Sequence, residues 1–574
     1  MRWIHAPFDA GRAREFARAT GLCRPAAEVL ARHSVGSLEE AEAFLDPRLA
    51  SLTDPFSLTG MDAAVDRLLA AMHKGEDILV FGDYDVDGVT STVILVDFLN
   101  RYGIYPRYIV PRRLEEGYGL SLIALQRALE EAVPSLVVAV DCGTGSNEPI
   151  AWLRQQGIDV VILDHHTPKE GSPLPTDCVI VNPHVHDGEG NPWFDLCAVG
   201  IVFKFVHALL KRLREADDPL AYKIRLKDYL DLVALGTIAD LVPLTGENRI
   251  FVSHGLRLLR ETHRTGLCAL FEVGGVRLGD EITPFDVSFR IGPRINASGR
   301  LADAREPIEM LLSEDWRKCR ATAQELDGFN RDRQRIERAI AEEAVAMIED
   351  RFSDAPGFIL YGPDWHPGVV GIVASRIVNK FNRPALVLGE ESGQAKGSGR
   401  SVEGIDLVQI LNPCADILES WGGHPMAVGL TVDPAFIPEL RERFCAGLVE
   451  VTQGVMPEPT LTVSTVIGLE DLTETLLADL SRLAPFGQGN PEPVFHLRGA
   501  MIENAQPLGQ TGLHSRFFVR TPALGNVSGL AWGWAPEKLP SSGSPVDLAV
   551  RFSWNSWQGR KSPRLTLLDW RRVG

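Results

Sequence analysis

The stretch ILVFGDYDVDGVTS (78–91) decides the fold. A short apolar run, Ile78–Gly82, precedes three aspartates at alternate positions, Asp83, Asp85 and Asp87, and a glycine then turns the chain toward a helix. Alternate residues of an extended segment lie on the same side of it. If the segment stays extended, the pattern predicts three carboxylates that face the same way at the end of a strand.

The segment around this stretch, residues 60–270, repeats a strand-then-helix order. The strand candidates are Ile78–Gly82, Leu136–Val140 and Val160–Leu163, and helical patterns over Thr90–Arg101 and Leu120–Ala132 lie between them. Short continuous apolar runs that alternate with helices indicate a parallel sheet covered on both faces. Ligands of such sheets bind beyond the carboxyl ends of the strands, so the polar residues that follow these runs are candidate site residues.

Acids and histidines follow the later apolar runs as well. The second run leads into Asp141, the third into Asp164, His165 and His166, and Asp240 follows another apolar stretch. An aspartate at a strand end is commonly a helix N-cap, but capping accounts for one acid per helix and not for three within five residues. Clustered carboxylates repel one another unless cations neutralise them, and mixed Asp and His ligands suit Mn²⁺ or Mg²⁺. Two such ions support in-line displacement at phosphorus.

Composition limits the classes of protein that remain. The 574 residues suggest three or four domains. No apolar run reaches the ~18 residues that span a bilayer, and the first residues lack the apolar stretch of a signal peptide. Eight cysteines without a C-x-x-C pair are typical of thiols in a reducing compartment. We therefore expect a soluble, cytoplasmic protein.

The formal net charge of −18 argues against a protein that coats nucleic acid over its whole surface. It leaves room for a basic channel on an acidic body.

The second half of the chain changes pattern twice. Between Ser313 and Phe352 there is no proline and only one glycine, which predicts a long helix with Ser313 as its N-cap, joining two lobes. Beyond it, Gly357–Gly362 and Pro384–Gly389 indicate a second α/β unit. After about residue 455, short alternating strands predict a small β-barrel, with candidates Phe517–Arg520, Leu530–Trp534, Val546–Trp554 and Arg564–Trp570.

Four motifs resemble, in order, those of the DHH phosphoesterase superfamily: GDYDVDGVTS (82–91), VDCGTG (140–145), LDHH (163–166) and ADLVPL (239–244). Flanking motifs narrow the resemblance to the RecJ family, and they are LDPRLASLTDPFSLTGMDAAVDRL (45–68), VPRRLEEGYGL (110–120), GPRINASGRL (292–301), HPGVVGIVASR (366–376), GGHPMAVGL (422–430) and APFGQGNPEPVF (484–495). The resemblance runs almost end to end. It implies an exonuclease that degrades single-stranded DNA from its 5′ end, in DNA repair and recombination.

The resemblance also implies an α/β fold in five parts: an N-terminal segment (1–60), a parallel-sheet DHH catalytic domain (61–305), a long connecting helix (306–352), a DHH-associated substrate-binding domain (353–455) and an OB-fold-like nucleic-acid-binding barrel (456–574).

For the metal site, the resemblance implies two Mn²⁺ or Mg²⁺ ions, held by Asp85, Asp87, Asp141, His165 and Asp240. Asp83 serves in the first metal site or orients a ligand, and Asp141 bridges the two ions. His166 faces the scissile phosphate as a catalytic group, and Asp164 orients its neighbours. One residue departs from the superfamily pattern, since Phe81 stands where many members carry a histidine. Phenylalanine cannot bind a cation, which leaves the occupancy of the first metal site open.

For the substrate and partners, the resemblance implies binding of the 5′-terminal phosphate and the strand by Arg113, Arg294, Arg300, Ser398, Arg400 and His424. It also implies a RecQ-type helicase and a single-strand-binding protein as partners, and a monomer.

Two rival interpretations remain. The chain could be a superfamily phosphodiesterase that acts on short oligoribonucleotides or cyclic dinucleotides, although such small substrates need no extended barrel. It could also be a non-catalytic replication scaffold, although every acid of the metal motifs and both DHH histidines are present.

Overall fold

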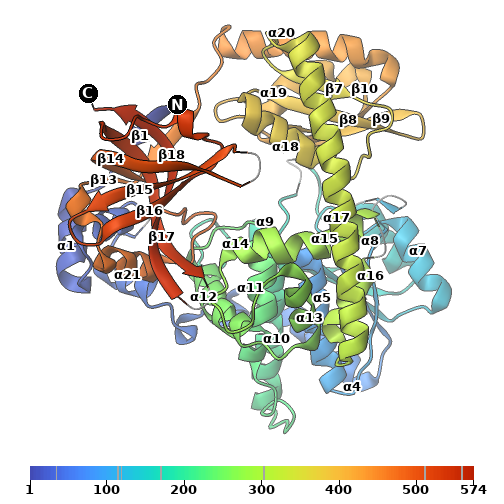
Figure 1. Ribbon diagram of the computed structural model, residues 1–574. Helices are drawn as coiled ribbons and strands as arrows, with labels where there is room; N and C mark the ends of the chain where they lie inside the picture. Colours follow the sequence, from blue (N-terminus) through green and yellow to red (C-terminus); the bar gives the residue numbers. More distant parts are fainter. Residues whose placement is uncertain are drawn as a thin grey trace. The chain divides into compact units, whose positions relative to one another are not determined.

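The computed structural model describes residues 1–33, 35–112, 116–117, 119–168, 171–301, 304–509, 512–557 and 560–573. Its contacts divide the chain into two compact units (Figure 1). The smaller unit consists mainly of Gln324–Thr460, and the larger consists mainly of Trp3–Asn296 and Leu461–Gly574. No helix among the described residues combines the length and the apolarity that crossing a bilayer requires.

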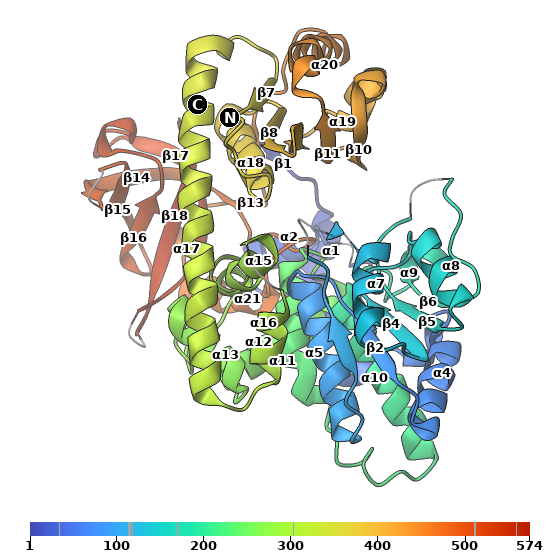
Figure 2. The ribbon, with the colours of Figure 1, turned by 90° about the vertical axis from the view of Figure 1, so that its right-hand side faces the viewer.

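The larger unit contains a five-stranded parallel sheet in the order β3-β2-β4-β5-β6 (Figure 2). Its strands are β2 (Ile78–Phe81), β3 (Arg107–Ile109), β4 (Leu136–Val140), β5 (Asp159–Leu163) and β6 (Val179–Val181). Every residue of β2 and β4 is buried, as expected for strands covered on both faces. The parallel sheet predicted from the sequence is confirmed, and each of the three predicted strands lies within one residue of its predicted bounds.

Helices cover both faces of this sheet. On one face, α7 (Leu122–Glu131) and α8 (Asn147–Gln155) share a hydrophobic core with side chains of β2, β4 and β5. The helices α4 (Met61–Lys74), α5 (Val86–Arg101) and α10 (Ala198–Glu215) contact the sheet as well, and α10 contacts both α4 and α5. Further helical elements of this region include α9 (Pro183–His186), the 3₁₀ turn η3 (Leu226–Tyr229), α11 (Leu230–Ala239), α12 (Gly246–Arg260), α13 (Thr265–Gly274), α14 (Pro284–Asp286), the π-helical turn η4 (Val287–Ile291), α15 (Gly292–Leu301) and α16 (Arg305–Leu312).

The predicted long helix is present as α17 (Trp316–Met347), and the π-helical turn η5 (Ile348–Phe352) continues it. Its predicted cap was wrong. The side chain of Asp315, not that of Ser313, accepts hydrogen bonds from the first-turn N–H groups of Arg317 (2.8 Å) and Lys318 (3.3 Å). A carboxylate is both a good cap and a favourable charge at a helix N-terminus.

The smaller unit is a second α/β structure. Its sheet has the order β10-β11-β9-β8-β7, in which only β7 and β8 are parallel. The elements are β7 (Phe358–Tyr361), α18 (Val370–Phe381), β8 (Ala385–Glu391), β9 (Gln394–Arg400), α19 (Leu407–Leu411), β10 (Leu418–His424), β11 (Ala427–Val432) and α20 (Ile437–Thr452). Ile340 and Ala344 of α17 lie in the core of this unit, so the long helix is part of the packing and not only a connector.

The C-terminal part of the larger unit is the predicted barrel. Its strands are β13 (Thr465–Ile467), β14 (Phe495–Leu508), β15 (His514–Thr521), β16 (Gly525–Ala531), β17 (Pro545–Trp557) and β18 (Arg560–Arg572). Pairing of β14 with both β15 and β17 closes a ring of five strands, with β13 at its edge. The predicted strand Leu530–Trp534 was misplaced, because β16 ends at Ala531 and a turn follows.

The N-terminal helices pack on this barrel, which the sequence did not indicate. Phe16 of α1 (Ala10–Thr20) and Leu30 of α2 (Arg24–Leu30) belong to the same hydrophobic core as Phe495 of β14. The blue helix α1 lies beside the red strands in Figure 1. Further elements here are α3 (Leu38–Leu45), α21 (Glu474–Leu483), and β1 (Arg2–His5), which pairs with β12 (Thr460–Val463).

A buried ion pair ties the N-terminal segment to the helices of the parallel-sheet domain. Lys204 of α10 is fully buried, and its Nζ lies 2.8 Å from Oε2 of Glu247 in α12. The same ammonium group donates hydrogen bonds to the carbonyl oxygen (2.9 Å) and the hydroxyl (2.8 Å) of Thr53.

We expect Lys204→Met to destabilise the larger unit by about 3–5 kcal/mol, because Glu247 would become a buried charge without its partner. The matched control is Lys211→Met on the same helix, since the Lys211–Asp54 pair is partly exposed and should contribute about 1 kcal/mol or less. Thermal unfolding followed by circular dichroism measures both. Equal midpoints for the two variants would contradict this account of the buried pair.

Candidate functional site

The first acidic motif forms a strand end, a loop and a helix start. Strand β2 ends at Phe81, and Asp85 is the N-cap of α5. Its Oδ1 accepts hydrogen bonds from the N–H groups of Asp87 (2.9 Å) and Gly88 (3.1 Å). The prediction that three acids share one side of an extended segment was therefore wrong, because Asp87 already belongs to the first helical turn. A Cβ on Gly88 would lie 2.5 Å from the carbonyl oxygen of Asp83, so only glycine fits this tight return.

Asp87 is buried and is held by the start of another helix. Its two carboxylate oxygens accept hydrogen bonds from the N–H groups of Ala198 and Val199, each at 2.8 Å, in the first turn of α10. Helix N-termini favour negative charge. Burial and the neighbouring charge of Asp85 nevertheless raise the pKa of Asp87 to about 7.

Asp141 follows β4 in a left-handed backbone conformation, with a φ of 62°. Its N–H donates a 3.0 Å hydrogen bond to the carbonyl oxygen of Leu163 at the end of β5. This contact joins two strand ends and directs the Asp141 carboxylate into the cluster. Burial, followed by the charge of Asp87, raises the pKa of Asp141 well above its ordinary value.

Asp164 organises the two histidines that follow it. Its Oδ1 accepts hydrogen bonds from the backbone N–H groups of His165 (2.8 Å) and His166 (3.2 Å), and it lies 2.8 Å from Nδ1 of the His166 ring. Burial alone would raise the pKa of Asp164, but the hydrogen bond with His166 lowers it well below its usual range. Burial lowers the pKa of His166, but Asp164 outweighs this effect and raises it to about 9. The pair is therefore a carboxylate and an imidazolium at neutral pH.

His165 lies at the centre of the cluster. Its Nε2 is 3.3 Å from Oδ1 of Asp141, 3.6 Å from Oδ2 of Asp240 and 3.8 Å from Oδ2 of Asp87. Burial and the charge of His166 lower the pKa of His165 to about 4, so its ring is neutral and offers a lone pair.

Asp240 joins this group from the C-terminal end of α11. Burial and the charges of Asp87 and Asp85 raise its pKa to about 9.

These residues fit divalent cations. Among the described residues, two groups bring three ligand atoms within 4.8 Å of one another: Asp141, His165 and His166, and Asp87, His165 and Asp240. His166 could bind a cation only after losing its proton, because an imidazolium has no lone pair. Within the part of the chain that the structure describes, Oδ1 of Asp141 and Nε2 of His165 are buried without a hydrogen-bond partner. Buried polar atoms of native proteins are normally satisfied, and a cation between these oxygen and nitrogen atoms would satisfy both. Asp83, also buried, adds its charge to the field at Asp141.

Two further polar residues hold this cluster, and the sequence interpretation missed them. The side-chain amide of Asn182 donates hydrogen bonds to the hydroxyl of Thr144 (2.9 Å) and the carbonyl oxygen of His166 (3.0 Å). The N–H of Thr144 donates to Oδ2 of Asp164 (3.0 Å). Asn182 directly follows β6, so the strand-end rule that found the acids would have found it on the next strand.

Phe81 takes no part in the cluster. Its ring is fully buried in the hydrophobic core on the side of the sheet covered by α7 and α8. Phe81, the residue that departs from the superfamily pattern, is therefore part of the hydrophobic core and not of the metal site.

Ser398 and Arg400 lie on β9 in the smaller unit, beside the first turn of α18. A Cβ on Gly371 would lie 3.2 Å from Oγ of Ser398 and 3.5 Å from Nη2 of Arg400. The helix start, the hydroxyl and the guanidinium group therefore surround one small volume that a longer residue at 371 would fill. Arg400 is partly buried, which lowers its pKa, and helix N-termini with such neighbours suit phosphate.

His424 is exposed at the end of β10 in the same sheet. It pairs with Ala427, which pairs with Arg400, so the three lie in one row across the strands. Gly423 before it has a φ of 146°, and a Cβ there would meet the carbonyl oxygen of Ala427 at 2.3 Å. The predicted substrate residues Ser398, Arg400 and His424 are thus brought together on one edge of the smaller unit.

The remaining predicted arginines are less informative. Arg294 lies in α15, where its guanidinium donates hydrogen bonds to the carbonyl oxygens of Arg290 and Val273. Arg113 and the side chain of Arg300 lie outside the described residues.

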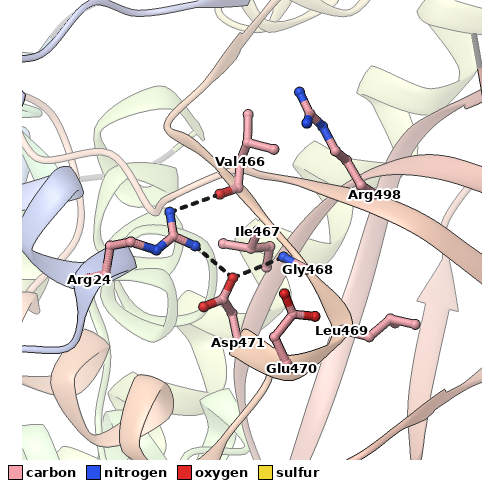
Figure 3. Close-up of a pocket in the computed structure, with 8 residues that line it drawn as sticks. All are labelled: Arg24, Val466, Ile467, Gly468, Leu469, Glu470, Asp471 and Arg498. Carbon is pink, nitrogen blue, oxygen red and sulfur yellow. Dashed lines mark hydrogen bonds and ion pairs between the residues drawn. The ribbon is translucent and has the colours of Figure 1, made fainter.

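A surface pocket of about 570 Å³ lies elsewhere, between α2 and the edge strand β13 (Figure 3). Arg24 reaches across it to Oδ2 of Asp471 (2.7 Å) and to the carbonyl oxygen of Val466 (3.5 Å). The same carboxylate oxygen accepts a hydrogen bond from the N–H of Gly468 (2.9 Å). None of the predicted metal or substrate residues that the structure describes lines this pocket. Arg24, one of the two arginines that line it, joins the N-terminal helices to the barrel.

Three family models match the chain. The DHH family N-terminal domain matches residues 77–237, the DHHA1 domain matches 354–450, and the RecJ OB domain matches 463–569.

Curated relatives cover nearly the whole chain. The single-stranded-DNA-specific exonuclease RecJ of Bacillus subtilis is 36% identical over 99% of this chain and 70% of its own length. That of Haemophilus influenzae is 35% identical over 92% of this chain and 93% of its own length. Among solved structures, Thermus thermophilus RecJ in complex with Mn²⁺ has a TM-score of 0.81 and 31% identity, covering 100% of this chain and 79% of that one. Its complex with Mg²⁺ has a TM-score of 0.76. The chain therefore belongs to the RecJ family of DHH proteins, whose curated members are single-stranded-DNA-specific exonucleases.

Proposed function

We propose that this chain is a metal-dependent exonuclease that hydrolyses single-stranded DNA from its 5′ end, releases 5′-mononucleotides and acts in DNA repair and recombination. One observation carries the proposal: the buried, unsatisfied Oδ1 of Asp141 and Nε2 of His165, 3.3 Å apart among further carboxylates. A donor set of this kind suits two ions, either Mn²⁺ or Mg²⁺. When bound, such ions supply positive charge to a phosphoryl group and lower the pKa of water.

In this proposal each residue of the acidic cluster has its own role. Asp85, Asp87, Asp141, His165 and Asp240 would hold the ions, with Asp83 beside them. By resemblance Asp141 would serve both ions, whereas the two groups of close ligand atoms share His165. His166, kept protonated by Asp164, donates a hydrogen bond to a non-bridging oxygen of the scissile phosphate as negative charge develops there. Asp164 acts through His166 and the backbone of the DHH motif, and Asn182 holds that backbone from the other side.

The 5′-terminal phosphate binds, in our proposal, to the smaller unit. Ser398 and Arg400 offer a hydroxyl and a guanidinium group beside the start of α18, and His424 contacts the strand at the same sheet edge. Arg113, Arg294 and Arg300 complete the substrate set by resemblance.

The five-part division of the chain remains part of the proposal, with metal chemistry in 61–305, end capture in 353–455 and strand binding in 456–574. A RecQ-type helicase and a single-strand-binding protein remain predicted partners.

Asp141→Ala should reduce shortening of a 5′-phosphorylated single-stranded 30-mer by about 10³-fold or more. Loss of a shared carboxylate removes several kcal/mol of transition-state stabilisation. A 3′-labelled 30-mer incubated with Mn²⁺, Mg²⁺ or chelator gives the polarity, the metal dependence and the rate in one gel. The matched control is Glu131→Ala, an exposed acid at the end of α7.

No shortening of the 30-mer by the wild-type chain would contradict the proposal. Hydrolysis of a 5′-phosphorylated or cyclic dinucleotide instead would favour a small-substrate phosphodiesterase. Absence of Mn²⁺ binding by calorimetry would favour a scaffold.

Arg400→Ala should abolish most of the preference for a 5′-phosphorylated 30-mer over its 5′-hydroxyl counterpart. A hydrogen bond to a charged group contributes about 1.5–3 kcal/mol, so the rate ratio of the two substrates should fall by about 10- to 100-fold. Lys396→Ala on the same strand is the control, since Lys396 is exposed and pairs with Glu391. An unchanged ratio in Arg400→Ala would remove this residue from the phosphate site.

Asn182→Ala should lower kcat by about 10- to 100-fold, as for other partners that orient a metal site. The loss should fall on kcat more than on KM, because His166 shifts while the strand-binding residues do not. A thermal midpoint close to that of the wild type would separate this effect from unfolding. Asn182→Asp keeps a side-chain oxygen but loses the N–H group that donates to the carbonyl oxygen of His166. This variant should therefore have a kcat as low as that of Asn182→Ala.

A further inference from the structure

The segment before α15 carries an exposed pair of aromatic rings. Phe285 in α14 and Phe289 in η4 are 60% and 65% exposed, and their ring centroids lie 4.6 Å apart with 32° between the planes. Covering such side chains is favourable, because it removes apolar surface from water. Two adjoining exposed rings are therefore a surface that a ligand can cover.

One end of this segment packs against the backbone of the metal cluster. A Cβ on Gly292, the first residue of α15, would lie 3.6 Å from Cγ2 of Val86 and 3.7 Å from Cβ of Ala239. Val86 stands between Asp85 and Asp87, and Ala239 precedes Asp240. Asn296 adds a direct link, because its Oδ1 accepts a 3.1 Å hydrogen bond from the N–H of Val86. Phe289 is three residues from Gly292, or roughly 5 Å along a helix axis.

The other end of the segment contacts the barrel. Oε2 of Glu281 lies 2.7 Å from Nζ of Lys561 in β18. The segment 281–292 thus reaches from the barrel to the metal cluster within the larger unit. Its two exposed rings stand between these two places.

Two cationic side chains of this region are paired with carboxylates, which disfavours a ligand that is held by net charge. Nη1 of Arg290 lies 3.2 Å from Oδ1 of Asp286, and Lys561 is paired with Glu281. A polyanion would gain little here from net charge. A ring face, by contrast, suits an unpaired base, since stacking of bases on aromatic side chains needs no particular sequence.

We infer that Phe285 and Phe289 form a stacking site for unpaired bases of a single strand that runs between the metal cluster and the barrel. The inference rests on the proposed function for the identity of the strand. It adds a base-binding contact that neither the metal ligands nor the phosphate-binding residues supply.

Binding of a 5′-phosphorylated, mixed-sequence 30-mer to the full chain tests the site. Fluorescence anisotropy measures this binding, and a metal chelator in the buffer prevents digestion of the strand. Phe285→Ala/Phe289→Ala should weaken binding by about 5- to 100-fold, the range for loss of one stacked base. The slope of log K against log salt should stay the same, because no phosphate contact is removed. Phe285→Tyr/Phe289→Tyr should bind within about twofold of the wild type, because each ring is kept.

The matched control is Tyr105→Ala. Tyr105 is 79% exposed and precedes β3, at the amino ends of the strands and therefore at the opposite edge of the sheet from the acids. Its loss should leave binding of the 30-mer unchanged.

An abasic scan then distinguishes stacking from general apolar contact. Single abasic sites moved along the 30-mer should weaken wild-type binding at one or two positions, and these losses should disappear in Phe285→Ala/Phe289→Ala. Unchanged affinity of that double variant, or an abasic profile equal to the wild-type profile, would overturn the inference. Unchanged affinity of the double variant would favour a protein, and not a nucleic acid, as the ligand of the two rings. If the wild type binds the 30-mer without shortening it, the proposed function fails while the stacking result stands.

Discussion

The mutual repulsion of carboxylates gathered at one edge of a parallel sheet is the constraint on which the rest of the site depends. Asp85, Asp87, Asp141 and Asp240 each bring a potential negative charge to the same small region, and burial makes those charges more costly. Burial raises the pKa values of Asp87, Asp141 and Asp240, and the charges of neighbouring carboxylates, with Asp85 among them each time, raise these values further. Without cations the group can fold only by keeping some protons, so metal binding and proton release are linked here.

The backbone supplies part of the compensation. Asp87 accepts two N–H groups from the first turn of α10, and Asp85 accepts two from the first turn of α5. These contacts fix where the carboxylates point. Asp164 is a different case, since Thr144, His165 and His166 all donate to it. Asp164 therefore stays charged without a cation, and its charge keeps His166 protonated. The protonated ring lies beside carboxylates that need positive charge to balance them.

The sequence predicted the parallel sheet because strands that are buried on both faces consist of short apolar runs. Ile78–Phe81 and Leu136–Val140 are clear examples. It also indicated which acids would gather, because parallel strands end at one edge. It did not show that Asp87 is helical, because alternating acids fit an extended segment as well as a helix that Asp85 caps. It gave no sign that Phe16 and Leu30 pack on the barrel, because that contact joins residues more than 400 positions apart. Asn182 was missed because a neutral amide does not suggest metal chemistry.

The overall acidity of the chain and its proposed substrate are reconciled by local recognition. With a formal net charge of −18, the protein as a whole does not favour the approach of a polyanion, and Arg290 beside Phe285 and Phe289 is paired with a carboxylate. In the proposed function, affinity would come instead from contacts that only certain strands can make: a terminal phosphate at a helix start, and unpaired bases on exposed rings. A duplex does not offer unpaired bases to such contacts. Weak general attraction combined with strong local contacts therefore favours the ends of single strands over the far more abundant duplex, without any need to read sequence.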